Sequence, residues 1–187
     1  KSPNLITTFG TESDLYINDV AGVMKFMNTG DKKSLSDGLN NLSDKISDDG
    51  MPCNVSVDIQ YKYKVIAMGN EYAVSCAQSL NIPVGEYDYL EGSAPQNRNE
   101  IAVTPKISEM LGAKIGDTVT IDFGTEKIDC IVTAYFQTMN NLGELIRLHD
   151  GAPTDMSCVS SIRQYQVDFT DNPSESEIES RKEKIKE

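Results

Sequence analysis

The sequence has no tryptophan, only one histidine, and too few basic residues to balance its acids. The 29 acidic and 17 basic side chains leave a formal charge of −12 on 187 residues. This charge would repel a phosphate backbone or an anionic lipid surface, so we expect no nucleic-acid partner. Because His149 is the sole imidazole, sites that need two histidines are excluded. We interpret His149 as an exposed loop residue.

Long apolar runs are missing as well. None approaches the roughly 20 residues that cross a bilayer as a helix. The longest uninterrupted stretches are as short as Val65–Met68. The length of 187 residues fits one large or two small domains, enough to bury a core without disulfides. The sequence starts at Lys1 without an initiator methionine or signal sequence and ends at Glu187 within a predicted helix. We therefore expect a soluble fragment of a longer protein.

The four cysteines lie too far apart for a paired metal or redox motif. They are separated by 23, 54 and 28 positions: Cys53, Cys76, Cys130 and Cys158. Zinc binding and thioredoxin-like chemistry are therefore not expected. Apolar neighbours favour free, buried thiols. The sequence does not exclude up to two disulfides. They could form in any of three pairings, and the spacing does not distinguish these pairings.

Residue periodicity predicts helices and strands in the first half of the chain. The pattern favours a strand at Asp14–Ile17, a helical stretch before Gly30, and a helix that Ser34 caps and Gly50 ends. From Val55 to Val65 apolar residues alternate with polar ones, which predicts a strand with one buried and one wet face. The spacing of Ala73, Cys76, Ala77 and Leu80 predicts a short helix that opens at Asn70.

Shorter elements follow a loop at Gly92–Asn99. Thr104 and Pro105 predict a helix start and Gly112 its end. A turn at Gly116 and Asp117 leads into a further strand. The remaining predicted strands are Ile101–Val103, Val119–Phe123, Ile128–Phe136, Cys158–Ile162 and Gln164–Phe169, while Leu142–Leu148 is ambiguous. The alternation in Gln164–Phe169 predicts a return to the first sheet, and a capping box at Ser174 predicts the last helix.

No catalytic, cofactor-binding or metal-binding residues emerge from a search for motifs. The Walker A, GxSxG and GxGxxG patterns are absent. Asp48 and Asp49 lack the alternating carboxylates of a calcium loop. Tyr87 and Tyr89, set among acids, could offer two rings to a sugar or peptide, although alternating tyrosines more often pack one face of a strand.

Three consecutive motifs carry a family resemblance. They are the loop Gly92-Ser93-Ala94-Pro95, the strand Asn99-Glu100-Ile101-Ala102-Val103, and the turn from Leu111 through Gly116-Asp117 to Val119. In this order and spacing, the segment from Tyr87 to Ile121 resembles the extracytoplasmic domain of FtsX-like and MacB-like ABC transporter permeases. The match covers about 35 residues closely, and the flanking elements agree by order alone.

The resemblance implies a two-lobed α+β fold. A discontinuous porter-like α/β lobe would comprise residues 1–84 and 151–187, with residues 85–150 as an inserted small β-rich lobe. The domain would lie on the extracytoplasmic side of the cell membrane, in a homodimeric or heterodimeric permease that works with a cytoplasmic ABC ATPase. Its role would be non-catalytic: recognition and mechanical transmission that couple ATP hydrolysis to export or to work outside the membrane. A peptide, a lipoprotein or a cell-wall enzyme would be its partner.

Two other functions stay open from the sequence. The first is a secreted module that binds cell-wall glycan or peptide through the Tyr87 and Tyr89 region, and the second is a cofactor-binding subunit of an enzyme. The sequence does not determine the substrate or partner, the direction of transport, the oligomeric state of the isolated domain or the disulfide state.

Overall fold

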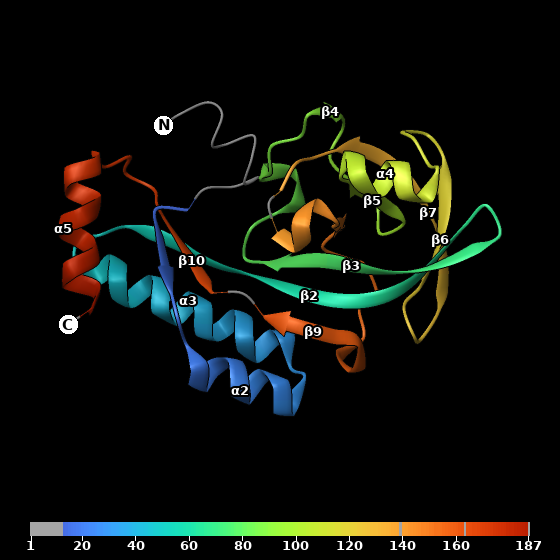
Figure 1. The fold of residues 1–187 in the computed structure, drawn as a ribbon. Coiled ribbons are helices and arrows are strands. Elements are labelled where there is room, and N and C mark those ends of the chain that lie inside the picture. The colour runs from blue at the N-terminus through green and yellow to red at the C-terminus, as the bar shows by residue number, and fades with distance from the viewer. Residues whose placement is uncertain (1–12, 139, 163, 187) are drawn as a thin grey trace. The chain divides into compact units, whose positions relative to one another are not determined.

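A computed structural model describes residues 13–138, 140–162 and 164–186 (Figure 1). Residues 1–12, which belong to the predicted discontinuous lobe, lie outside this described part. The chain forms two compact units. We call residues 13–58 with 164–186 the terminal unit, and residues 59–162 the central unit. Strand β2 (Cys53–Ala67) begins in the terminal unit and ends in the central one.

The terminal unit combines an antiparallel sheet with helices. Its strands follow the order β1 (Leu15–Ile17), β10 (Tyr165–Phe169) and the first part of β2. Its helices are α2 (Val20–Thr29), α3 (Lys32–Asp48) and α5 (Glu175–Lys186). Apolar side chains of α2, α3 and the strands are buried together as its core: Phe26, Leu35, Leu39, Ile46, Val55, Val57, Val167 and Phe169. The pairing of β10 with β2 confirms the predicted return to the first sheet.

Aspartate caps set the starts of α2 and α3. The Asp19 carboxylate accepts a hydrogen bond from Gly22 N at 2.9 Å, and Gly30, with φ +64°, ends the helix. Asp31 likewise accepts from the backbone N–H groups of Lys33 and Ser34. The cap predicted at Ser34 is therefore wrong by three residues, because Asp31 satisfies the free amides of the first turn about one turn earlier.

The central unit is rich in short strands. They are β3 (Asn70–Leu80), β4 (Glu91–Gly92), β5 (Glu100–Val103), β6 (Thr118–Asp122), β7 (Lys127–Tyr135), β8 (Ile146–Leu148) and β9 (Val159–Ile162). One helix, α4 (Pro105–Leu111), and three 3-10 turns, η1 (Val84–Glu86), η2 (Asn140–Gly143) and η3 (Met156–Cys158), connect them. Pairing runs β2-β3-β8-β5-β7, and β6 pairs with both β7 and β2, so the path closes on itself. The predicted α+β class is confirmed.

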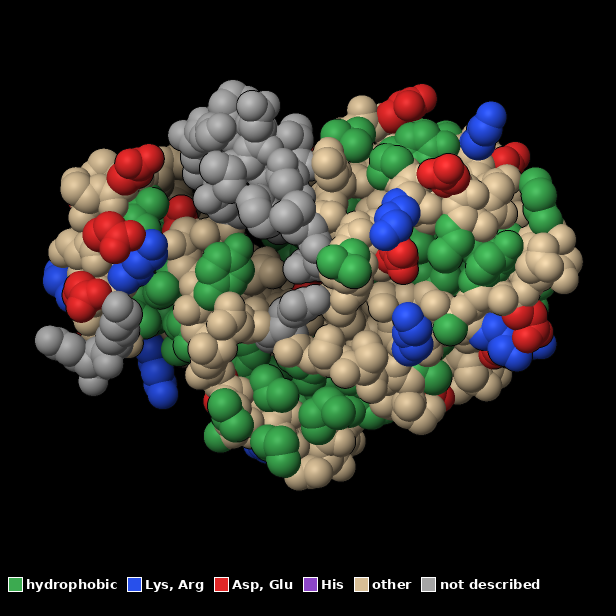
Figure 2. Space-filling model, viewed as in Figure 1, with side chains coloured by type: hydrophobic (Ala, Val, Ile, Leu, Met, Phe, Trp, Pro, Cys, Tyr) green, Lys and Arg blue, Asp and Glu red, His purple; other side chains and the backbone are tan. Residues whose placement is uncertain are grey.

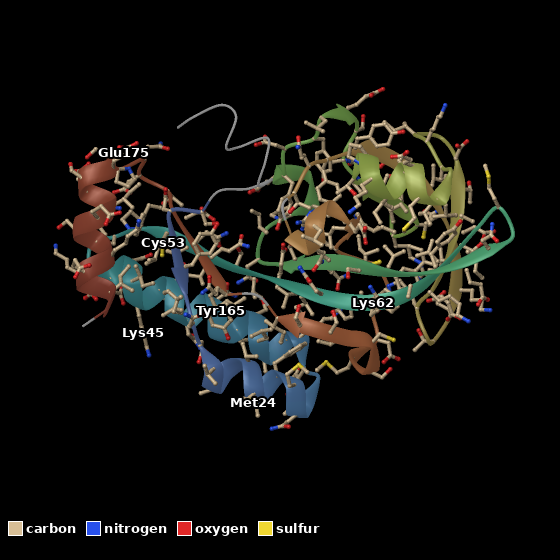
Figure 3. The ribbon with its side chains drawn as sticks, in the orientation of Figure 1. Met24, Lys45, Cys53, Lys62, Tyr165 and Glu175 are labelled. Carbon is tan, nitrogen blue, oxygen red and sulfur yellow. The ribbon has the colours of Figure 1, made fainter. Side chains whose placement is uncertain are left out.

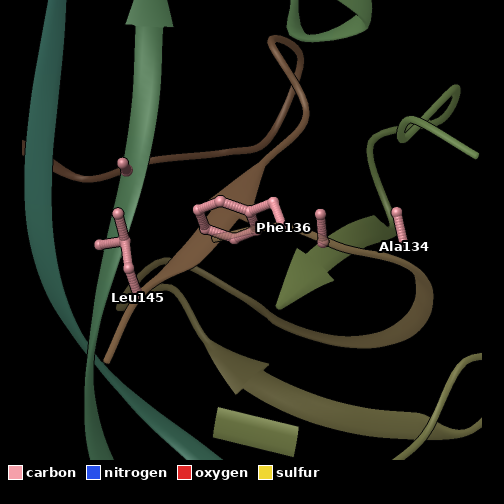
Figure 4. Close-up of a cluster of buried hydrophobic side chains, with 5 residues drawn as sticks. Ala134, Phe136 and Leu145 are labelled. Atoms are coloured by element: carbon pink, nitrogen blue, oxygen red, sulfur yellow. The ribbon is translucent and has the colours of Figure 1, made fainter. Parts of the chain in front are cut away.

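The interior of the central unit includes a cluster of small side chains around one ring. Ala77, Ala102, Ala134 and Leu145 lie with Phe136 (Figure 4), and each is at most 3% exposed. The alanines come from three neighbouring elements, β3, β5 and β7, so they leave room for the phenyl ring between the strands.

The predicted helix at Asn70–Leu80 is wrong, because this segment is strand β3. Met68 and Gly69 both have positive φ, as in a tight two-residue hairpin turn, and return the chain beside β2. On its other edge β3 pairs in parallel with β8. Hydrogen bonds on both edges thus outweigh the helical spacing of the apolar residues.

The predicted wet face of β2 is correct only near its end. Lys62 and Lys64 are exposed, but Ser56, Asp58 and Gln60 are buried. The Gln60 side-chain oxygen accepts hydrogen bonds from Asn141 and Ser161, which places its amide in the interior of the central unit.

The segment before residue 85 is shared between the two compact units. Residues 59–84 group with the predicted insertion, because β3 pairs with β8 and the end of β2 pairs with β6. The described segments on either side of residues 59–162 form one compact unit, and the division into a porter-like lobe and an inserted lobe stays a prediction.

Several predicted turns are confirmed. The Thr104 hydroxyl accepts from Ile107 N, Pro105 is the first residue of α4, and Gly112 ends it with φ +62°. Gly116 has φ +95° and donates to Val132 O at 2.8 Å. Within the described residues, no helix combines the length and apolar character needed to cross a membrane.

Candidate functional site

The described part of the chain holds no cluster of three or more His, Cys, Asp or Glu side chains that could bind a metal ion. All four cysteines are free thiols, of which Cys158 alone is not fully buried. Burial raises the pKa of the Cys76 thiol and raises that of Cys130 to about 12. Neither thiol is therefore suited to act as a nucleophile near neutral pH.

The two tyrosines considered for ligand binding do not form an exposed pair. Tyr87 is 6% exposed, its hydroxyl is hydrogen bonded to Ser79, and the Arg147 guanidinium carbon lies 3.7 Å from its ring centroid. Tyr89 is half-buried and donates to Val84 O at 2.6 Å. The rings are thus used in internal packing, although not on a strand face as predicted.

The terminal unit contains a hollow of about 290 Å³ between α2, α3 and β10. Gly22, Lys25 and Thr29 line it from α2, and Tyr165 lines it from β10. From α3 it is lined by Ser34, Leu35, Gly38, Asn41, Leu42 and Lys45, whose spacing places them on one helix face. Figure 3 shows Lys45 extending away from α3, and Tyr165 on the neighbouring strand.

Both acidic side chains that line the hollow already accept hydrogen bonds. Asp19 and Asp31 cap α2 and α3, and the hydrogen bond from the Ser34 hydroxyl is the main cause that lowers the pKa of Asp31. Burial, with a smaller contribution from Asp19, raises the pKa of Tyr165, so its phenol stays protonated. Among the described residues, neither Lys25 nor Lys45 has a carboxylate within 4.0 Å.

Sequence reasoning did not identify this hollow. The available signal was Gly38 inside an otherwise regular amphipathic helix, flanked at helical spacing by Ser34, Asn41 and Lys45. The partner helix α2 and the strand β10 come from distant parts of the chain, so the enclosure itself depends on tertiary structure.

A second surface of α2 is apolar and exposed. Val20, Met24 and Met27 are 73%, 56% and 42% exposed, and Lys25 is the one charged residue of the helix. Figure 2 shows hydrophobic side chains gathered over this helix, and Figure 3 shows Met24 on its outer side.

The C-terminal helix is fastened to the sheet of the terminal unit by one arginine. Arg181 of α5 donates to both carboxylate oxygens of Asp171, at 2.8 and 2.6 Å. Its guanidinium carbon also lies 4.7 Å from the ring centroid of Phe169, the last residue of β10. A planar guanidinium with two parallel hydrogen bonds and a stacked ring holds its partners in a defined orientation. These contacts therefore attach α5 to the end of β10 and to the turn that follows it.

No protein-family model and no curated protein matches the sequence. Among solved structures, the extracellular domain of the noncanonic ABC-type transporter YknZ from Gram-positive bacteria is similar, with a TM-score of 0.50 and 12% identity. That match covers 89% of this chain and 86% of the YknZ domain. The periplasmic region of MacB from Actinobacillus actinomycetemcomitans has a TM-score of 0.49 and 10% identity, over 79% of this chain and 72% of that one.

A domain of a putative permease protein from Porphyromonas gingivalis gives a TM-score of 0.45 and 13% identity. The match covers 68% of this chain and 63% of that one, so the chain spans less than two thirds of that domain. The resemblance predicted from residues 87–121 is confirmed at the level of the fold: this chain has an α+β fold similar to that of the extracellular domain of the ABC-type transporter YknZ.

Proposed function

We propose that this chain is the extracytoplasmic domain of an ABC transporter permease, one that couples cytoplasmic ATP hydrolysis to substrate export or to work outside the membrane. The observation that carries the proposal is the shared fold with the YknZ extracellular domain over 89% of this chain. The domain itself would be non-catalytic. A cytoplasmic ATPase and a second permease subunit would be its partners in the membrane, and a peptide, lipoprotein or cell-wall enzyme its partner outside.

The terminal unit supports a mechanical role. It contains the helices α2, α3 and α5 and the strands on both sides of the central segment. The bidentate contact between Arg181 and Asp171, two residues after β10, attaches α5 to the chain that leaves this strand. The domain would thereby transmit a displacement of its C-terminal helix into the sheet, and the predicted two-lobed division would separate transmission from recognition.

The test begins with the full native gene. We expect one apolar stretch of about 20 residues before this segment and three after it. A tag inserted at the exposed Met68–Gly69 turn of the full-length protein should be cut by protease added outside intact cells. An ATP-binding protein should also co-purify with the permease. A cleavable signal peptide with no membrane span downstream, or a tag that is cut only after the cytoplasmic membrane is broken, would refute the proposal.

A further inference from the structure

His149, the sole imidazole of the chain, lies in a turn immediately after β8. Its Nδ1 accepts a hydrogen bond from Gly151 N at 3.0 Å. This nitrogen can accept only while it carries no proton, so the neutral ring must have its proton on Nε2. A ring protonated on both nitrogens would set one N–H group against another. The contact with Gly151 therefore requires the neutral form of the side chain.

The register of β5 and β8 places an acid across from this imidazole. Ile101 is paired with Leu148 in the antiparallel ladder, so the next position outward brings Glu100 opposite His149. Directly opposed residues of an antiparallel pair point to the same face, with β-carbons about 5 Å apart. The Glu100 carboxylate is therefore within reach of the His149 ring.

Two further charged side chains in the described part of the chain lie close to this turn, and both have partners. Arg98 lies against Gly151, where an added β-carbon would be 3.9 Å from the Arg98 β-carbon. The Arg98 guanidinium pairs with Glu126 at 2.7 Å. The Asp150 carboxylate accepts from Val84 N at 3.2 Å. Glu100 is therefore the charged group to which a protonated imidazole would turn.

Glu100 keeps its charge at mildly acidic pH. Its carboxylate accepts hydrogen bonds from the Asn97 side chain at 2.8 Å and from Gln96 N at 2.7 Å. The bond from Asn97 is the main cause that lowers the pKa of Glu100, and the bond from Gln96 acts in the same direction. Histidine is the side chain that changes charge between about pH 5 and 8. In this range a fixed anion thus lies opposite a titrating ring.

The turn that His149 closes is connected to two other elements of the central unit. The Gln78 side-chain amide of β3 donates to three carbonyl oxygens of the turn, at 3.2, 3.0 and 3.1 Å: those of His149, Asp150 and Ala152. The Asp150 carboxylate accepts from Val84, the first residue of η1. A rearrangement of this turn would therefore change the contacts of β3 and η1.

We propose that His149 is a pH switch for the turn at residues 149–152. In the neutral form, its ring accepts from Gly151 N and keeps the turn closed. When the ring takes up a second proton from water, it releases Gly151 and pairs with the Glu100 carboxylate, and the turn loosens its contacts with β3 and η1. Every contact involved lies within the central unit, so the inference does not depend on the transporter assignment.

The experiment records NMR spectra of the 15N-labelled 187-residue chain between about pH 8 and 5. The imidazole nitrogens should show the Nε2–H tautomer at the upper end and a doubly protonated ring at the lower end. The signals of the Gly151 amide and of the Gln78 side-chain amide should shift with the same midpoint as the ring. At the acidic end, protection of the Gly151 amide from hydrogen exchange should fall at least about threefold, as for the loss of one hydrogen bond. The Gly116 amide, which donates to the Val132 carbonyl, should keep its protection.

Three variants locate the effect. In His149→Asn the side-chain oxygen can accept from an amide two residues on and does not titrate, so the Gly151 signal should no longer depend on pH. Glu100→Gln should move the midpoint of the ring to lower pH, because the protonated ring loses its opposite charge. The control Glu109→Gln removes an exposed acid on α4 and should leave the midpoint unchanged.

The outcomes distinguish a switch from a passive turn residue. A Gly151 signal that stays constant in the parent chain, or that titrates equally in His149→Asn, would overturn the proposal. A neutral ring protonated at Nδ1 would do so as well, because that nitrogen could not accept. Equal midpoints in Glu100→Gln and Glu109→Gln would show that Glu100 is not the partner of the charged ring.

Discussion

Arg147 is a buried cation that lies over aromatic rings. It is 5% exposed, its guanidinium carbon lies 3.7 Å from the Tyr87 ring centroid and 5.6 Å from that of Phe136, and it donates to the Ser79 hydroxyl at 3.0 Å. The ring faces attract the cation, and its aliphatic stem adds packing. This residue therefore organises the interior next to η1.

Replacing Arg147 with alanine should lower the free energy of unfolding by about 3 kcal/mol, because the change removes both ring contacts and leaves a cavity. Arg98→Ala serves as the control. It breaks an exposed ion pair with Glu126 and should cost less than about 1 kcal/mol. Urea unfolding at neutral pH measures both. Equal losses would mean that Arg147 does not have the packing role assigned to it.

The partial burial of Lys32 predicts that the stability of the fold depends on pH. Partial burial lowers its pKa from the ordinary 10.5 to about 8, so the folded state disfavours the charged form. Between about pH 8 and 10.5 the Lys32 amine binds more protons in the unfolded chain than in the folded one. The free energy of unfolding therefore increases as pH rises through this range. Lys32→Gln should therefore stabilise the chain at pH 7, with a gain that shrinks above pH 8 and vanishes near pH 11.

The matched control for Lys32 is its neighbour. Lys33 is exposed and pairs with Asp37 at 2.6 Å, and the Asp37 hydrogen bond raises its pKa. Lys33→Gln should therefore give no gain at pH 7. Thermal unfolding over the pH range compares the two, and a gain from Lys32→Gln that persists at pH 11 would exclude the burial explanation.

At the scale of elements, α5 depends on its arginine contact more than on its own sequence. Apart from Ile178 and Ile185 its side chains are polar or charged, and so thin an apolar stripe stabilises little. The capping box is confirmed, since Ser174 N donates to the Glu177 carboxylate at 2.7 Å. The Arg181 contact with Asp171 and Phe169 supplies the tertiary attachment.

Arg181→Ala should release α5 while the rest of the chain stays folded. We expect faster amide hydrogen exchange in residues 175–186 and little change in the melting temperature, because none of the α5 side chains whose burial is described, residues 175–185, belongs to the buried core of the terminal unit. Lys184→Ala, on the same helix, should leave exchange unchanged. Unaltered exchange in Arg181→Ala would remove the structural basis for transmission through this helix.

The turn at Gly116 gives a second test at this scale. A β-branched residue is strained at φ +95°, so Gly116→Val should lower the free energy of unfolding by about 1–3 kcal/mol. Gly85 has open space around it and no positive φ, so Gly85→Val should lower the free energy of unfolding by less than Gly116→Val does. Urea unfolding distinguishes them, and an unchanged midpoint for Gly116→Val would contradict the turn.

At the scale of the whole molecule, the excess of acids destabilises the compact state by self-repulsion. The net charge is −12 and the sequence pI is about 4.5. At pH 7, raising NaCl from about 20 to about 300 mM should increase the melting temperature by a few degrees, because salt screens like charges. Near pH 4.5 the same change should have almost no effect. A salt response that is equal at both pH values would rule out self-repulsion as its cause.

The sequence alone determined the features that depend on neighbouring residues. The caps at Thr104 and Ser174, the turn at Gly116 and the alternation of β10 all rest on contacts within a few positions, and each is present in the structure. The spaced motifs between Gly92 and Val119 likewise indicated the fold, because they fix a strand, a helix and a turn in order.

Tertiary structure decided the rest. Only pairing with β2 and β8 makes residues 70–80 a strand, since their apolar spacing also suits a helix. Gln60 is buried because Asn141 and Ser161 reach it from 81 and 101 positions away. The hollow exists because α2, α3 and β10 converge around two glycines, and periodicity along the chain carries no information about which distant elements meet.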